Sequence, residues 1–354
     1  MSFSDGISAI NLEMSERVPR TEYGPTDNWP LVRAVTGIDV NEASDVSTRR
    51  KASRAMEQAW NFDFRWNVWV GAGNGHFPGR YTKMGHAVFD EGGTDYSEEV
   101  DCPFAEPEEV LAFDPMEEYG PADIAKITKE FNDNYDNQID LNPDAVNMTG
   151  IYTTCVSGLI EMFGWDMLLT AAGTDPKAFG EVTNRYTAWI SRHFQALAEC
   201  KAPIVMVHDD IVWTEGAFMH PDWYKKFVFP NYKKMFAPVL EAGKKIMYTS
   251  DGTYHQFVDD IADCGVHGFV MEPTTDMGYI AEKYGKTHCF VGNADTRILL
   301  LGSKEDIYNE VKRCMDIGKK CPGFFMAVGN HIPPNTPVEN AIYYNECYEK
   351  LGRR

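Results

Sequence analysis

The chain has 354 residues, of which 44% are hydrophobic and 13% aromatic, and its formal net charge is −20. This composition excludes a disordered chain and suffices for one large core or two domains. The negative charge argues against nucleic acid or an acidic membrane surface as a partner. We find no apolar run of about 18 residues, so no transmembrane helix is predicted.

The first residues lack the basic and apolar segments of a secretory signal. None of the eight cysteines forms a C-x-x-C pair. We therefore expect a cytoplasmic protein with reduced thiols.

The first part of the chain predicts an N-terminal extension over residues 1–60, with helices at 29–35 and 48–60. Residues 62–70 alternate in polarity and predict a strand. The glycine-rich segment 71–100, which contains His76 and His86, predicts a hairpin insertion that is either a lid or a solvated loop. Aromatic side chains near the first strand either line a pocket or belong to the core; they are Trp66, Trp69, Phe77 and Tyr81.

The remaining chain alternates between short apolar runs and amphipathic helices. Strands are predicted at 147–153, 204–207, 246–248, 269–271, 289–291 and 324–328. Apolar stripes with the helical period lie between them at 179–197, 257–264 and 307–315. This alternation indicates a parallel sheet in one α/β domain over residues 1–354. A (β/α)8 TIM barrel is the favoured fold, and a doubly wound open sheet is the alternative.

Polar groups that can ligate a metal or move a proton follow five successive predicted strands. They include His208, Asp209, Asp210, Asp251, Glu272, Asp295, Asn330 and His331. The carboxyl ends of barrel strands converge on one face, so these groups predict a site there. Each acid alone is weak evidence, because an acid after a strand is often a helix N-cap; Asp251 and Asp295 both allow that interpretation.

A mixed set of carboxylates and imidazole suits Zn²⁺ with one open coordination position. We predict Asp251, Glu272 and His331 as the ligands, and another divalent metal remains possible. The alternative trio is Asp295, Glu310 and His331. Glu310 falls on a predicted outer helix, so we interpret it as a surface acid. No nucleotide-binding motif follows a strand.

The blocks at 250–252, 292–296 and 329–340 resemble the uroporphyrinogen decarboxylase superfamily. The segment 208–212, with His220-Pro221 and Phe229-Pro230, is also similar, and the resemblance covers the chain from about residue 150 onward. It implies a (β/α)8 barrel that performs either porphyrinogen decarboxylation or corrinoid- and thiol-linked methyl transfer.

Two differences from the superfamily pattern limit which branch of the superfamily the chain resembles. The arginine-rich N-terminal signature of the decarboxylases is absent around Arg17 and Arg20. The cysteine ligands of the thiol-directed methyltransferases are replaced, since Thr249, Asp251 and Asn330 stand at the corresponding positions. The chain is therefore most similar to the branch of methyltransferases that demethylate methoxylated compounds (O-demethylase methyltransferase I).

That resemblance implies a zinc-dependent methyltransferase whose small, methoxylated and aromatic substrate gives its methyl group to a corrinoid carried by a partner protein. Asp210, Asp295 and Tyr248 are predicted to be catalytic. His208, Asp209, Tyr152 and Asn330 are predicted to bind substrate. A metal-free lyase similar to uroporphyrinogen decarboxylase and a non-enzymatic binding module are the alternatives, and a homodimer remains open.

Overall fold

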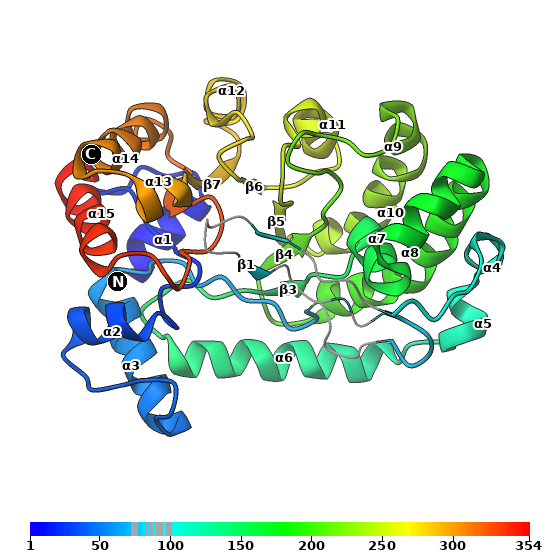
Figure 1. Cartoon of the computed structure of the whole chain (residues 1–354), viewed down its shortest axis with the longest axis horizontal. Helices are drawn as coiled ribbons and strands as arrows, with labels where there is room; N and C mark the ends of the chain where they lie inside the picture. Colours follow the sequence, from blue (N-terminus) through cyan, green and yellow to red (C-terminus); the bar gives the residue numbers. More distant parts are fainter. Residues whose placement is uncertain (72–76, 83, 85–87, 90–94, 97–100) are drawn as a thin grey trace.

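A six-stranded parallel sheet forms the centre of the computed structural model (Figure 1). The structure describes residues 1–71, 77–82, 84, 88–89, 95–96 and 101–354. Its strands follow the order β3-β4-β5-β6-β7-β8. Their bounds are β3 Thr149–Ile151, β4 Ile204–His208, β5 Lys245–Thr249, β6 Gly268–Val270, β7 Cys289–Ala294 and β8 Phe324–Val328. All six predicted apolar runs thus contain a strand, which confirms the α/β class and the parallel sheet.

Two extended segments connect the edge strands β8 and β3 through isolated parallel bridges. Arg20 pairs with both Met326 of β8 and Phe62, while Phe64 pairs with Val146 just before β3. The predicted strand at 62–70 is therefore a bridged segment rather than a regular strand. Six regular parallel strands are observed in the described part of the chain, and a complete eight-stranded barrel stays a prediction.

Helices surround the sheet (Figure 1). In the first half they are α1 Phe3–Ile10, α2 Trp29–Thr36, α3 Val46–Ala59, α4 Pro107–Ala112, α5 Pro115–Tyr119, α6 Ile124–Leu141, α7 Cys155–Thr174 and α8 Pro176–Glu199. In the second half they are α9 Pro221–Phe227, α10 Phe229–Glu241, η1 His255–Phe257, α11 Val258–Ala262, α12 Met277–Tyr284, α13 Thr296–Leu301, α14 Lys304–Gly318 and α15 Val338–Leu351. Helices occur at each predicted amphipathic stripe.

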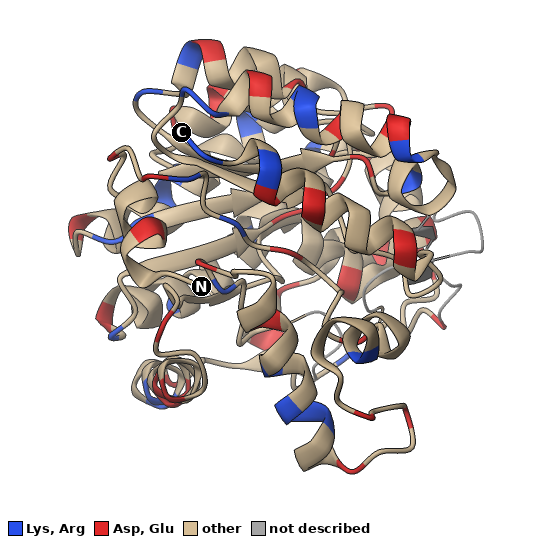
Figure 2. Ribbon diagram, turned by 90° about the vertical axis from the view of Figure 1, so that its left-hand side faces the viewer, with Lys and Arg blue, Asp and Glu red and all other residues tan. Residues whose placement is uncertain are grey.

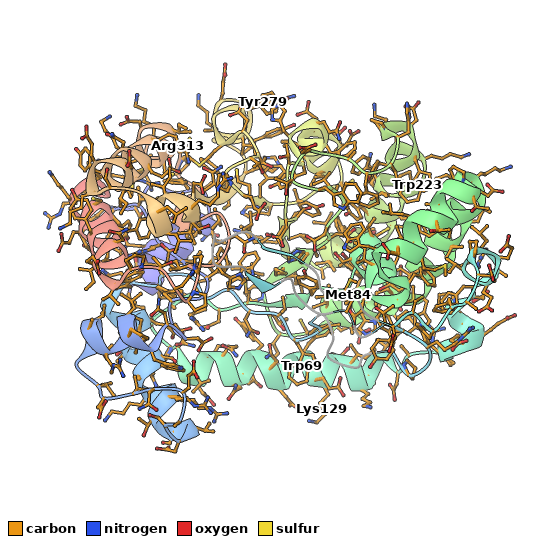
Figure 3. The ribbon with its side chains drawn as sticks, in the orientation of Figure 1. Trp69, Met84, Lys129, Trp223, Tyr279 and Arg313 are labelled. Carbon is orange, nitrogen blue, oxygen red and sulfur yellow. The ribbon has the colours of Figure 1, made fainter. Side chains whose placement is uncertain are left out.

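Local sequence explains where α14 begins and which face it buries. Ser303 and Asp306 form a capping box at its start, which satisfies backbone N–H groups that have no partner in the helix. Its buried residues include Ile307, Val311 and Cys314, at the spacing of one helical face. Because this face packs on β7 and β8, polar residues such as Lys312 and Asp316 are exposed on the other side of the helix. Figure 3 labels Arg313 on α14 and Tyr279 on α12.

The sheet is buried on both faces, so its strands read as continuous apolar runs. One hydrophobic cluster, formed mainly by side chains of the strands and of the segment beside them, includes Phe64, Met206, Met247 and Phe325. A larger cluster fills the space between strands and helices. On the face drawn in Figure 2, acidic and basic residues are interspersed along the outer helices, and no single-sign patch stands out in that view.

Two further segments bear on the sequence predictions. Within 71–100, β1 (Val88–Phe89) pairs antiparallel with β2 (Asp95–Tyr96).

Among the described residues one helix, α7, is long and apolar enough to cross a membrane by composition, and 72% of its most apolar window is buried inside the protein. Burial of that kind is typical of a core helix, so α7 is weak evidence for a membrane span.

Candidate active site

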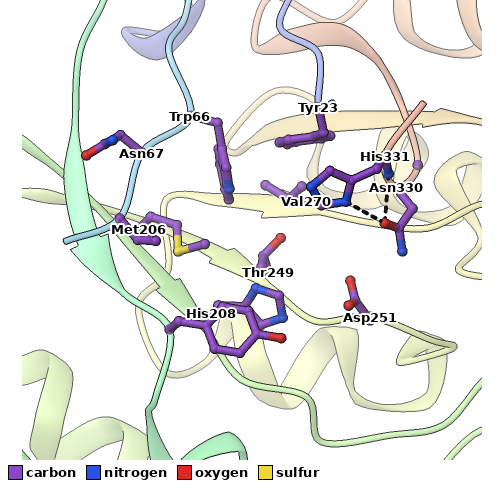
Figure 4. A pocket seen from close by; sticks show the side chains of 13 residues that line it. Tyr23, Trp66, Asn67, Met206, His208, Thr249, Asp251, Val270, Asn330 and His331 are labelled. Carbon is purple, nitrogen blue, oxygen red and sulfur yellow. Dashed lines mark hydrogen bonds between the residues drawn. The ribbon is translucent and has the colours of Figure 1, made fainter. Parts of the chain in front are cut away.

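A pocket of about 320 Å³ opens at the carboxyl ends of the strands. Three strand ends build most of its polar wall, because His208 ends β4, Thr249 ends β5, and Asn330 and His331 follow β8. Its described lining consists of Tyr23, Trp66, Asn67, Val68, Tyr152, Met206, His208, Thr249, Asp251, Val270, Gly329, Asn330 and His331 (Figure 4). Pockets for small molecules have volumes of about 300–1,000 Å³, so this volume lies near the lower end of that range.

Three acid and imidazole side chains converge on one side of this pocket. The ligand atoms of His208, Asp210 and Asp251 all lie within 4.8 Å of one another, and this is the one group of its kind among the residues described. Nε2 of His208 is 2.7 Å from Oδ1 of Asp210, and the backbone N–H of Asp251 donates to the same oxygen at 2.9 Å. The hydroxyl of Tyr152 donates to Oδ2 of Asp210 at 3.0 Å. The turn after β4 is thereby tied to the turn after β5.

This hydrogen bonding determines the charge of Asp210. Burial opposes its ionisation, but the neighbouring His208 and the hydrogen bonds from Asp251 and Tyr152 outweigh burial and lower the pKa of Asp210 to about 2. At neutral pH the side chain is therefore a carboxylate. It can ligate a cation or orient His208, but it carries no proton to donate.

His331, Asn330 and Glu272 form a second hydrogen-bonded group beside the first. Oδ1 of Asn330 accepts from the backbone N–H of His331 at 2.7 Å and lies 3.0 Å from its Nδ1 (Figure 4). The Asn330 amide donates to Glu272 at 2.5 Å, and Gly252 N–H donates to the other Glu272 oxygen at 2.8 Å. Burial, with a smaller effect of His208, lowers the pKa of His331, so its imidazole is neutral.

The predicted metal ligands are thus neighbours but do not form the observed cluster. Asp251 and His331 line the pocket, whereas Glu272 is outside the described lining and holds Gly252 and Asn330 in place. His208 and Asp210, which the sequence predicted as substrate-binding and catalytic residues, join Asp251 instead.

Among the predicted substrate-binding and catalytic residues, His208, Tyr152 and Asn330 line the pocket. Asp209 and Tyr248 are not in its described lining, and both are fully buried. The Tyr248 hydroxyl donates to the backbone oxygen of Asp209 at 3.1 Å. These two residues support the strand ends and do not line the described wall of the pocket.

Asp209 connects β4 to the start of α7. Its Oδ1 accepts from the backbone N–H groups of Val156 and Ser157 at 2.7 and 2.6 Å, and its Oδ2 accepts from the Tyr232 hydroxyl. Burial raises the pKa of Asp209 to about 6, although these donors favour the carboxylate. The carboxylate also faces the positive end of the α7 dipole.

Asp295 and Glu310 lie together at another place in the fold. Asp295 caps α13 and pairs with Arg297 at 2.6 Å, as in the N-cap interpretation of this residue. Glu310 accepts from Asp295 N–H at 2.9 Å and pairs with Arg313 at 2.6 Å. The interpretation of Glu310 as a surface acid is wrong, because the residue is 7% exposed and turned inward by these two donors.

The sequence reasoning missed Tyr23 and Thr249 as pocket residues and left Trp66 open between pocket and core. Tyr23 follows the bridged segment around Arg20, so it too stands at the end of an extended stretch that pairs with β8. Applying the strand-end rule to that stretch would have found it. Trp69, Phe77 and Tyr81 are not part of the described lining, and His76 and His86 fall outside the described residues.

Residues 117–351 match the family model described as uroporphyrinogen decarboxylase (URO-D). The chain belongs to the uroporphyrinogen decarboxylase family. This confirms the superfamily resemblance and extends it toward the N-terminus, to α5.

The curated relatives are similar to this chain over only part of their length. It is 24% identical over 179 residues to uroporphyrinogen decarboxylase from Geobacter metallireducens, which is 51% of each chain. It is 26% identical over 182 residues to uroporphyrinogen decarboxylase from Coxiella burnetii, which is 50% of this chain and 48% of the relative. The chain therefore spans about half the length of the curated relatives it matches.

Solved structures agree with the fold over nearly the whole chain. A methyltransferase from Methanosarcina mazei superposes with a TM-score of 0.63 at 17% identity and covers 99% of both chains. A B12-independent methionine synthase from Shewanella sp. W3-18-1 superposes with a TM-score of 0.51 at 9% identity, over 94% of this chain and 98% of that chain. At these identities the likeness shows a shared fold.

Proposed function

We propose that this protein is a methyltransferase that moves a methyl group from a small methoxylated aromatic compound to the cobalt of a corrinoid carried by a partner protein. A zinc ion held by His208, Asp210 and Asp251 would assist the reaction. The observation that carries the proposal is the convergence of one imidazole and two carboxylates within 4.8 Å beside a small pocket.

The donor chemistry of this cluster fits zinc. Nitrogen and oxygen ligands from three side chains, with room for a substrate atom, are typical of catalytic zinc sites. All eight cysteines are described and none lines the pocket, so no thiolate would reduce the Lewis acidity of the ion. His208 would bind through its neutral form and give up any proton it shares with Asp210. When bound, the ion would supply an electrophile for the ether oxygen.

The proposed transfer would break the bond between methyl carbon and ether oxygen and would join the methyl carbon to cobalt, with the electron pair supplied by the reduced corrinoid of the partner. The oxygen would leave as a phenolate and take a proton from solvent. Asp210 is ionised, so its part is to hold charge and orient His208. Tyr152 keeps Asp210 in place through Oδ2, and its ring contacts His208 at a tilt of 46°, with ring centroids 3.9 Å apart.

The similarity to a methyltransferase over the full chain supports this proposal by analogy of fold. The second candidate is a metal-free lyase similar to uroporphyrinogen decarboxylase, which the family model and the names of the curated relatives favour. A polycarboxylate tetrapyrrole needs cationic partners, and the described lining contains neither lysine nor arginine. We therefore rank methyl transfer first.

A methyl-transfer assay tests the proposal. The zinc-loaded protein is mixed with reduced corrinoid and a panel of methoxylated aromatics, and the cobalt spectrum reports methylation. Asp251→Ala should slow the transfer at least about 100-fold, since it removes a metal ligand. Asp222→Ala is the matched control, because Asp222 lies in an exposed pair with His220 at 3.6 Å. Absence of methylation with every donor, or an active Asp251→Ala variant, would contradict the proposal; metal-free turnover of a porphyrinogen would favour the lyase.

A further inference from the structure

Two aromatic rings form the wall opposite the acid and imidazole cluster. Tyr23 and Trp66 lie across the pocket from His208 and Asp251 (Figure 4). The rings of Tyr23 and Trp66 meet edge to face with centroids 5.5 Å apart, and Trp66 meets Phe64 in the same way at 6.2 Å. Edge-to-face pairs of this kind restrict the rings, so the wall is a preformed apolar surface suited to a flat ligand.

The backbone also holds Tyr23 in place. Its carbonyl oxygen accepts from Ile332 N–H at 2.9 Å, which ties it to the loop after β8. Gly24 follows with φ +81°, and a Cβ there would lie 3.1 Å from the Ile332 oxygen and 3.3 Å from the Cβ of His331. Because the two segments approach so closely, Tyr23 and His331 keep fixed positions relative to each other.

The hydroxyl of Tyr23 is a buried donor for which the described residues offer no partner. Its oxygen is shielded from solvent and makes no hydrogen bond within the described part of the chain, although the residue lines the pocket. A buried hydroxyl without a partner is unfavourable, so an acceptor on a bound ligand would satisfy it. Burial, with smaller effects of Glu22 and Asp251, raises the pKa of Tyr23 well above its ordinary value, and the group therefore donates.

The charge of the pocket limits what can bind between these walls. Its described lining holds Asp251, the carboxyl group of Asp210 lies within 4.8 Å of the Asp251 carboxyl in the cluster with His208, and the described lining has no lysine or arginine to offset the two acids. A ligand carboxylate would lose its hydration and meet negative charge. A zinc ion in the cluster would neutralise the charges of Asp210 and Asp251. It would leave no positive charge to pair with the carboxylate of a ligand.

We propose that Tyr23 and Trp66 are specificity-determining residues, which select an uncharged methoxylated phenol over a methoxylated benzoate. The aromatic ring lies on Trp66, and the hydroxyl of Tyr23 donates to the phenol oxygen beside the methoxy group. This inference rests on the proposed function for the identity of the ligand, and it adds the substituent that the site recognises.

Equilibrium binding to the full, zinc-loaded chain without corrinoid tests the inference by calorimetry. The ligands are 2-methoxyphenol, methoxybenzene and 2-methoxybenzoate, and the phenol is uncharged at pH 7 because its pKa is about 10. Wild type should bind 2-methoxyphenol about tenfold more tightly than methoxybenzene, equal to about 1.4 kcal/mol, and at least about tenfold more tightly than 2-methoxybenzoate.

Tyr23→Phe should bind 2-methoxyphenol and methoxybenzene equally, with the affinity for methoxybenzene unchanged. Trp66→Ala should weaken all three ligands, and Trp66→Phe should restore part of the loss if the alanine variant does not fold. The controls are Tyr308→Phe on α14 and Trp69→Ala, since Trp69 is 39% exposed and outside the described lining.

Three results would overturn the inference: wild type binds none of the ligands, Tyr23→Phe keeps the preference for the phenol, or 2-methoxybenzoate binds as tightly as 2-methoxyphenol. Because the assay contains no corrinoid, its outcome is independent of methyl transfer. The expected binding pattern without transfer to cobalt would contradict the proposed function and leave the recognition by Tyr23 and Trp66 in place.

Discussion

Replacing Tyr232 with phenylalanine removes a single hydroxyl from the buried network below the pocket. That hydroxyl donates to Oδ2 of Asp209, while Oδ1 keeps its two donors from the start of α7. Both side chains are fully buried, so water does not replace the lost donor. Since the pKa of Asp209 is about 6, the group is mainly ionised at pH 7.5, and the buried carboxylate loses one of its hydrogen-bond donors.

The magnitude follows from the charge of the acceptor. A hydrogen bond to a charged group contributes about 1.5–3 kcal/mol, against about 1 kcal/mol for a bond between neutral groups. Tyr254→Phe is the matched control, because Tyr254 is equally buried and its hydroxyl donates to the neutral backbone oxygen of Val270 at 2.9 Å. We expect Tyr232→Phe to lower the free energy of unfolding by about 1 kcal/mol more than Tyr254→Phe does.

Urea denaturation at pH 7.5 provides the assay, with metal removed so that ligand binding does not shift stability. The two variants should show the same dependence on urea as wild type, and Tyr232→Phe should have the lower midpoint. Equal losses in the two variants would refute the claim that an ionised Asp209 links β4 to α7.

Other substitutions test the rest of the framework. Gly24→Ala should destabilise the protein by about 1–2 kcal/mol more than Gly37→Ala in thermal unfolding, because both have positive φ but only Gly24 meets neighbouring atoms within 4 Å. Burial lowers the pKa of His267 in the folded state, so its contribution to stability is present above the unfolded pKa of about 6.5 and is lost as the pH falls. His267→Gln should therefore reduce the loss of stability between pH 7.5 and pH 5, measured by urea denaturation. Glu310→Ala should lower the free energy of unfolding by about 2 kcal/mol, because it removes the acceptor of the Asp295 backbone N–H and the carboxylate that pairs with Arg313. Removal of a surface acid would cost almost nothing.

The sequence was sufficient to place the pocket but not to assign every side chain around it. Buried parallel strands produce continuous apolar runs, and the residue after each run must lie at the carboxyl edge of the sheet. This reasoning predicts that His208, Asp251 and His331 lie at one edge of the sheet, and all three line the described wall of one pocket. It needs only local pattern and the parallel direction of the strands.

The assignment of neighbouring acids depended on contacts distant along the chain. Asp209 and Asp210 are consecutive, yet Asp209 binds the start of α7 and Asp210 belongs to the cluster with His208 and Asp251. The position of the Asp209 side chain depends on hydrogen bonds from Val156 and Tyr232, which are 53 and 23 residues away along the chain. Glu310 was misassigned for the same reason, since its acceptor role depends on a backbone N–H 15 residues earlier. No periodic pattern encodes such contacts.

The affinity for zinc of a single histidine variant tests the central claim most directly. His208→Ala removes one of the three converging ligands, and His220→Ala removes a histidine from an exposed pair with an acid two residues later, as in His208 and Asp210. In a competition titration with a chromophoric chelator, His208→Ala should bind zinc at least about 100-fold more weakly than wild type, and His220→Ala should match wild type. Wild-type affinity in His208→Ala would show that the ion, and with it the chemistry proposed for this pocket, is held elsewhere.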